Sequence, residues 1–131
     1  MWAWQFHKAL QVSEKHGWAR FVSMQDHYNL IYREEEREMM PLCLAEGKAT
    51  TPWSPLARGY LAGSGPTPEG SNTATVRGRT DPYSKSLKLG TGQDPLIRER
   101  LMREAARLGT ALKAISRAVS KPLIPPPRAM C

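Results

Sequence analysis

An aromatic side chain between prolines, followed by a turn of small residues, is the part of this sequence best suited to binding chemistry. It reads Pro52-Trp53-Ser54-Pro55-Leu56-Ala57-Arg58-Gly59. Each proline restricts its own φ and the residue before it and removes a backbone donor, so the segment is stiff before a ligand arrives. The Trp53 ring can therefore lie against a planar ligand. The turn that follows can approach a phosphate group closely.

A second run, residues 21–36 (FVSMQDHYNLIYREEE), has the pattern of a strand that leads into a helix. Together the two runs resemble the aldo-keto reductases, which are NADP-dependent oxidoreductases built on a (β/α)8 barrel. The resemblance is close over residues 1–62 and loose after them. The part of the family that this chain resembles is the second half of the barrel, and Met1 falls where the family has the end of its fifth strand.

Chain length limits the fold that this resemblance implies. A (β/α)8 barrel needs about 250 residues, and the sequence has 131. We therefore expect an α/β fold that is a partial TIM barrel, a C-terminal fragment with about two parallel strands plus helices. The alternative is a start placed at an internal methionine of a longer frame. Residues 1–122 are expected to form the partial barrel, with a long mobile loop at 63–93, and residues 123–131 a proline-rich tail.

The resemblance implies NADP as the cofactor and assigns two residues to its nicotinamide ring. Trp53 matches the aromatic residue that stacks on the ring; the alternative is a tryptophan that only covers the barrel end. Gln25 matches the glutamine that hydrogen-bonds the carboxamide, where an amide that both donates and accepts fixes the orientation of the ring. The alternative for Gln25 is a side chain satisfied by neighbouring backbone.

Four further residues are assigned to the phosphates of the cofactor. Ser54, Leu56 and Gly59 match the turn whose backbone and hydroxyl meet the pyrophosphate. Arg77 stands where the family's cofactor-covering loop often has an arginine, and a guanidinium binds phosphate well. Because that alignment crosses a variable loop, a surface role for Arg77 is the alternative.

No catalytic residue is expected in this chain. The family uses a tyrosine proton donor with a lysine, an aspartate and a histidine, all in the first half of its barrel, and nothing here aligns with them. His7, His16 and His27 lack catalytic or ligand spacing and are expected at the surface or at helix ends. With two isolated cysteines, they give no zinc-site spacing.

Hydrophobic spacing and helix-ending residues predict the elements. We expect helices over residues 2–16, 33–46 and 94–108, a further helical face at Leu112, Ile115 and Val119 that ends at Pro122, and a strand over residues 20–25. A second strand is expected over residues 48–53; this segment is polar for a buried parallel strand, so the expectation rests on the resemblance more than on hydrophobicity. The two strands should be parallel neighbours joined by a right-handed crossover through the helix between them. Pro41 should bend that helix.

Composition favours a soluble cytoplasmic protein. The chain is 40% hydrophobic and 24% charged, which is ordinary for a globular domain. It has no apolar run of membrane-spanning length, and its N-terminus lacks the pattern of a secretory signal. Two lone cysteines suit a reducing compartment better than a disulfide scaffold.

The net charge of +7 favours an anionic partner, either a dinucleotide with a 2′-phosphate or a nucleic acid. Three functions follow. The leading one is a fragment of an NADP-dependent aldo-keto reductase that reduces aldehydes or ketones. The second is a non-catalytic binding or regulatory remnant of that fold. The third, a basic nucleic-acid-binding module, rests on charge alone, because no aromatic residues are interleaved with the basic residues of the C-terminal third.

Overall fold

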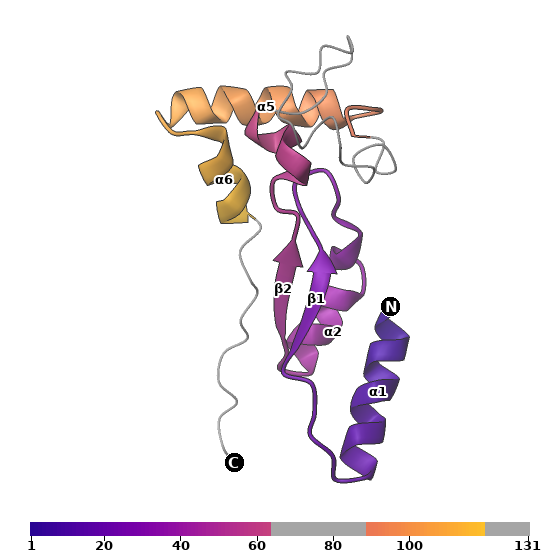
Figure 1. The fold of residues 1–131 in the computed structure, drawn as a ribbon. Coiled ribbons are helices and arrows are strands. Elements are labelled where there is room, and N and C mark those ends of the chain that lie inside the picture. The colour runs from indigo at the N-terminus through magenta and orange to yellow at the C-terminus, as the bar shows by residue number, and fades with distance from the viewer. Residues whose placement is uncertain (64–88, 120–131) are drawn as a thin grey trace. The chain divides into compact units, whose positions relative to one another are not determined.

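The computed structural model describes residues 1–63 and 89–119 (Figure 1). These residues divide into two compact units. The first unit contains residues 1–28 and 33–53, and the second contains residues 29–32, 54–63 and 89–119. The tail at 123–131, Arg77, and most of the predicted loop at 63–93 lie outside the described residues, so the predicted boundary after residue 122 stays a prediction.

The first unit is built on two parallel strands, β1 (Ser23–His27) and β2 (Ala49–Trp53). They are hydrogen-bonded neighbours, and the register pairs Ser23 with Ala49 and His27 with Trp53. This confirms the predicted parallel pair, although β1 begins later than predicted and extends beyond residue 25, where the predicted strand ended. Phe21 and Val22 have high β-propensity, but both are exposed before the strand begins.

The connection between the strands corrects the prediction of one helix over residues 33–46. A short 3-10 helix, η1 (Glu34–Glu36), is followed by a separate helix, α2 (Met39–Ala45). Glu38, between them, has φ −138°, which interrupts helical geometry. Pro41 therefore lies in the first turn of α2 and does not bend a longer helix, because a first-turn residue needs no intrahelical N–H bond.

Helix α1 (Ala3–Lys15) matches the first predicted helix within about a residue at each end and packs its apolar face against α2. Phe6, Leu10, Met39 and Cys43 form the core of this unit, each at most 2% exposed. Trp2, which precedes the first turn of α1, is 70% exposed. Gly17 has φ 65°, the left-handed conformation expected after a helix.

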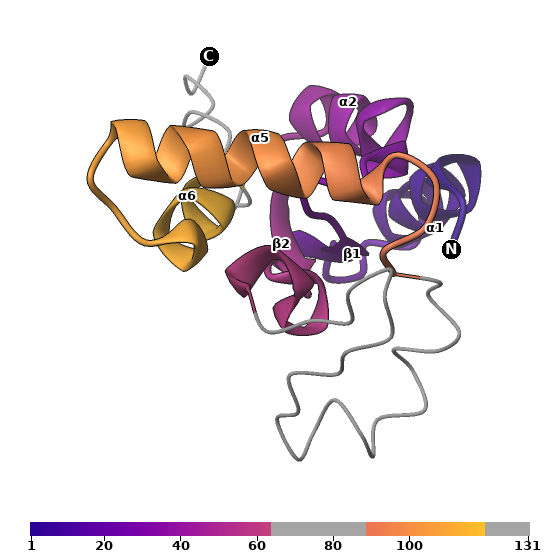
Figure 2. The same cartoon turned by 90° about the horizontal axis from the view of Figure 1, so that it is seen from above.

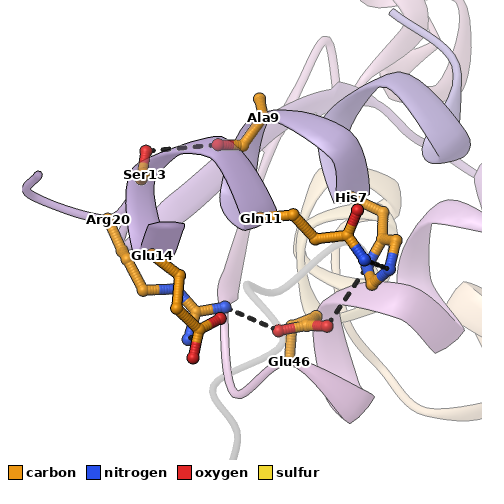
Figure 3. A network of polar contacts seen from close by, with 7 residues as sticks. All are labelled: His7, Ala9, Gln11, Ser13, Glu14, Arg20 and Glu46. Atoms are coloured by element: carbon orange, nitrogen blue, oxygen red, sulfur yellow. Dashed lines mark hydrogen bonds and ion pairs between the residues drawn. The ribbon is translucent and has the colours of Figure 1, made fainter. Parts of the chain in front are cut away.

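A polar network ties α1 to the end of α2 (Figure 3). Glu46, which follows α2, accepts a 2.8 Å hydrogen bond from Arg20 Nη2. The other carboxylate oxygen of Glu46 lies 3.2 Å from His7 Nδ1. Because Arg20 precedes β1, the network fixes the approach of the chain to the strand.

The second unit contains a short helix, η2 (Ala57–Ala62), which packs against α5 (Asp94–Arg107) and α6 (Leu112–Val119). Figure 2 shows α5 and α6 next to each other. Its core contains Ala57, Tyr60, Leu61 and Leu101. Both α5 and α6 confirm predicted helices. Pro95 is in the first turn of α5, while Asp94 accepts a 3.0 Å hydrogen bond from the Gly90 N–H. No helix in the described ranges is long and apolar enough to cross a bilayer.

Candidate functional site

The two strands present different residues on their two faces. Side chains alternate along a strand, so Gln25 and His27 share one face with Thr51 and Trp53 of the neighbouring strand. Met24 belongs to the other face and packs against the core formed by α1 and α2. The face of Gln25 and Trp53 is therefore the one opposite the helices. Gln25 and Thr51 are exposed on it.

Two aromatic rings stack at the carboxyl ends of the strands. The imidazole of His27 and the indole of Trp53 have centroids 4.2 Å apart and planes only 17° from parallel. The register explains the contact, because the two residues are direct neighbours across the strands. Trp53 is partly buried. The carboxyl ends of parallel strands are where α/β proteins bind ligands.

The loop after β1 begins with a buried phenol. Tyr28 is 7% exposed, and its hydroxyl donates a hydrogen bond to Glu36, which also accepts from Arg33. Hydrogen bonds from Arg33 and then Tyr28 lower the pKa of Glu36. Burial, followed by the bond to Glu36, raises the pKa of Tyr28. Tyr28 is therefore a protonated donor that holds η1 against the end of β1.

The helix-covered face contains a carboxylate that sequence reasoning did not single out. Asp26 is 3% exposed, and neither of its carboxyl oxygens has a hydrogen-bond partner among the described residues. Burial, followed by repulsion from Glu35, raises the pKa of Asp26 to about 6. The predicted strand ended at residue 25, so sequence spacing did not place Asp26 on a buried face of it.

Cys43 lies on the same covered face. Burial and the charges of Asp26 and Glu35 raise its pKa to about 11. The thiol is therefore protonated at neutral pH, which makes it a weak nucleophile. Within residues 1–63 and 89–119, no three His, Cys, Asp or Glu side chains are grouped as metal ligands.

The turn after β2 has an unusual backbone. Ser54, Ala57 and Arg58 have φ between 45° and 59°, the left-handed region that disfavours residues with a Cβ. The turn is closed by its own hydrogen bonds, including Gly59 N–H to the Leu56 carbonyl at 2.9 Å. Ser54 Oγ is buried and has no hydrogen-bond partner among the described residues. Strained backbone and unsatisfied hydroxyls are both concentrated at functional sites.

Asn29 holds this turn in place, a role the sequence did not reveal. Its side chain is 1% exposed and donates a 3.1 Å hydrogen bond to the Ser54 carbonyl. Its Oδ1 accepts bonds of 3.0 Å from the N–H groups of both Ile31 and Tyr32. One buried amide thus connects the loop after β1 to the first residue of the turn.

The second unit also has an open cleft of about 300 Å³ next to α5. Tyr60, Pro95, Arg98, Glu99 and Met102 line it, and the Arg98 guanidinium lies 5.1 Å from the centroid of the Tyr60 ring. Sequence reasoning did not identify this cleft, because its residues come from segments that are distant in the chain.

The predicted cofactor residues fall into two groups. Gln25 and Trp53 share the face of the strands opposite α1 and α2 in the first unit, whereas Ser54, Leu56 and Gly59 belong to the turn in the second unit. Arg77 lies outside the described residues. Their roles toward a cofactor stay predictions.

Comparisons with known proteins identify the family. The profile described as "Aldo/keto reductase family" matches residues 2–116, which is most of the chain. The chain therefore belongs to the aldo/keto reductase family, whose fold is a (β/α)8 barrel. The parallel strands and helices of the first unit agree with this fold class.

Three relatives illustrate the similarity. The chain is 45% identical over 97 residues to a candidate aryl-alcohol dehydrogenase of Schizosaccharomyces pombe, covering 74% of this chain and 26% of that protein. It is 53% identical over 62 residues to versiconal hemiacetal acetate reductase of Aspergillus parasiticus, covering 47% of this chain and 18% of the relative. It is 55% identical over 62 residues to an aldo-keto reductase of Alternaria alternata, covering 47% and 17%. The chain spans at most about a quarter of the length of these three relatives.

Proposed function

We propose that this chain supplies the nicotinamide-binding part of an NADP-dependent aldo-keto reductase that reduces an aldehyde or a ketone by hydride transfer. In this proposal the chain is a fragment of the enzyme and lacks its catalytic tetrad. The partners are NADP(H) and a small carbonyl substrate, and the compartment is the cytoplasm. The free, buried thiol of Cys43 is compatible with a reducing compartment.

The observation that carries the proposal is that an amide and an indole lie on the same face of a parallel strand pair, opposite α1 and α2 and toward its carboxyl end, in a chain of this family. Trp53 offers a rigid aromatic surface to a planar ring. Gln25 offers both a donor and an acceptor, which is what a carboxamide needs. The buried Ser54 hydroxyl, without a partner among the described residues, suits one phosphate oxygen.

These residues bind and orient; they do not transfer protons. NADPH supplies the hydride when it is bound. The stacked indole and the amide of Gln25 fix which face of the nicotinamide is presented to a substrate. The proton that the carbonyl oxygen gains must come from a group outside this chain, because nothing in the chain aligns with the family's tyrosine donor.

Replacing Trp53 or Gln25 with alanine should weaken NADPH binding severalfold. Stacking and a hydrogen bond of this kind contribute about 1 kcal/mol each. The measurement is a fluorescence titration with NADPH, made on the chain alone and on a hybrid barrel in which a relative supplies the missing strands. Thr51→Ala is the matched control, since Thr51 shares the same face without an assigned role. Unchanged affinity in Trp53→Ala would remove Trp53 from the site.

The chain alone should show no carbonyl reduction, while the hybrid barrel should be active. The reason is the missing proton donor, without which hydride transfer to a carbonyl has no acid partner. NADPH oxidation over a panel of aldehydes and ketones measures both proteins in parallel. Turnover by the chain alone would contradict the proposal, and NADPH binding without turnover in the hybrid would favour the regulatory remnant.

A further inference from the structure

We infer that the imidazole of His27 occupies the place on Trp53 that the nicotinamide ring takes, so that the cofactor must displace a side chain of the protein in order to bind. The inference rests on the proposed function, because it concerns how the same site is filled. It adds a residue to the site, His27, which neither sequence spacing nor the family resemblance assigned.

The first step is to establish which face of the indole is covered. Neighbouring strands lie about 5 Å apart, and side chains paired in register stand side by side on the same face of the sheet. His27 and Trp53 are such a pair, and their rings lie nearly parallel with centroids 4.2 Å apart. The imidazole therefore lies on the face of the indole that is directed toward β1.

The second step is to place Gln25 relative to the indole. Gln25 is on β1, two residues before His27, and its side chain is on the same face of the sheet. It is thus on the same side of Trp53 as the imidazole. A ring whose carboxamide is held by Gln25 must stack on the β1-directed face of Trp53. That face is the one His27 covers.

The alternative arrangement leaves one of the two groups unused. A nicotinamide on the opposite face of Trp53 would have the indole between itself and Gln25. Both contacts can form together only if the imidazole rotates away. The His27–Trp53 stack then competes with cofactor binding. The free energy needed to break the stack reduces the observed free energy of cofactor binding.

Removing His27 should raise the affinity for NADPH, whereas removing a residue that supports the cofactor lowers it. An aromatic stack of this kind is lost in His27→Ala, so this variant should bind NADPH about threefold to tenfold more tightly than the unmodified chain. His27→Phe keeps a flat ring on Trp53 and should bind no more tightly than the unmodified chain. Fluorescence titrations with NADPH measure all three proteins.

The chain contains a matched control. His16 stacks on Trp18 with centroids 5.0 Å apart and planes 28° apart, at the C-terminal end of α1 and outside both strands in the sequence. His16→Ala removes a histidine–tryptophan stack of the same kind and should leave NADPH affinity unchanged. A second probe, 2′-phospho-ADP-ribose, lacks the nicotinamide ring. Its affinity should be the same in the unmodified chain and in His27→Ala.

Nuclear magnetic resonance tests the displacement directly. The ring current of Trp53 should shift the carbon-bound imidazole protons of His27 upfield in the free chain. Saturation with NADP+ should move them back toward unstacked values. Imidazole protons that stay upfield in the saturated complex would overturn the inference.

The binding outcomes separate the inference from the function on which it rests. If the unmodified chain binds NADPH and His27→Ala binds equally or more weakly, the inference fails and the proposed function stands. Equal tightening toward both probes would also overturn the inference, because the effect would not involve the ring. Absence of NADPH binding by both proteins would overturn the inference and the binding role proposed for the chain.

Discussion

Asn29→Ala is expected to lower the free energy of unfolding of the second unit by about 2–3 kcal/mol. The substitution removes three side-chain hydrogen bonds, one to the Ser54 carbonyl and two from the N–H groups of Ile31 and Tyr32. It leaves these backbone groups next to a small cavity at a site that is 1% exposed. Thermal unfolding followed by circular dichroism measures the change.

Gln11→Ala provides the control for Asn29→Ala. Gln11 also forms a side-chain hydrogen bond, to His7, but at the surface of α1. Its loss should change stability by no more than about 0.5 kcal/mol. Equal stability of Asn29→Ala and Gln11→Ala would show that the buried amide does not hold the turn. Hydrogen exchange at residues 54–59 adds a local measurement, since protection there should fall only in Asn29→Ala.

Asp26→Asn is expected to stabilise the chain above pH 7 by on the order of 2 kcal/mol and to flatten its pH dependence. The folded-state pKa of Asp26 is about 6, raised mainly by burial. Folding therefore favours the protonated acid. The stability contributed by this proton is fully present below about pH 4, the pKa of an unperturbed aspartic acid. It is lost as the pH rises toward 6, and above that pH the chain carries a buried carboxylate without a hydrogen-bond partner among the described residues.

The measurement is unfolding by urea at several pH values between 4 and 8. The unmodified chain should lose stability across this range, and Asp26→Asn should not. Glu35→Gln tests the second cause, because removing its charge lowers the pKa of Asp26 and moves the loss to lower pH. An identical pH profile in Asp26→Asn would show that another group is responsible.

Local sequence signals predicted most of the elements. The helices at residues 3–15, 94–107 and 112–119 follow from apolar periodicity, and the parallel pair followed from the family resemblance. The break between η1 and α2 did not follow, because three acidic residues and an apolar stripe look like one helix. The backbone geometry of Glu38, with φ −138°, divides them.

Residues of the candidate site could be predicted only where the residue type and its motif indicate the role. Trp53 and Gln25 could be named from their motifs, and the structure places them on one face. The roles of Asn29 and Asp26 depend on burial and on partners distant in sequence, which no spacing rule contains. The His27–Trp53 stack depends on strand register, because a shift of one residue would place the two side chains on opposite faces and abolish the stack.

The parallel pairing of β1 and β2 also determines how this unit must fold. Every backbone contact between the strands joins residues separated by all of η1 and α2. The two strands cannot form as a hairpin first. The segment between them must therefore close before the hydrogen bonds between the strands can form. The rate of sheet formation should therefore respond to substitutions in the α1–α2 core, which contains Phe6 and Met39, at least as strongly as to substitutions in the strands themselves.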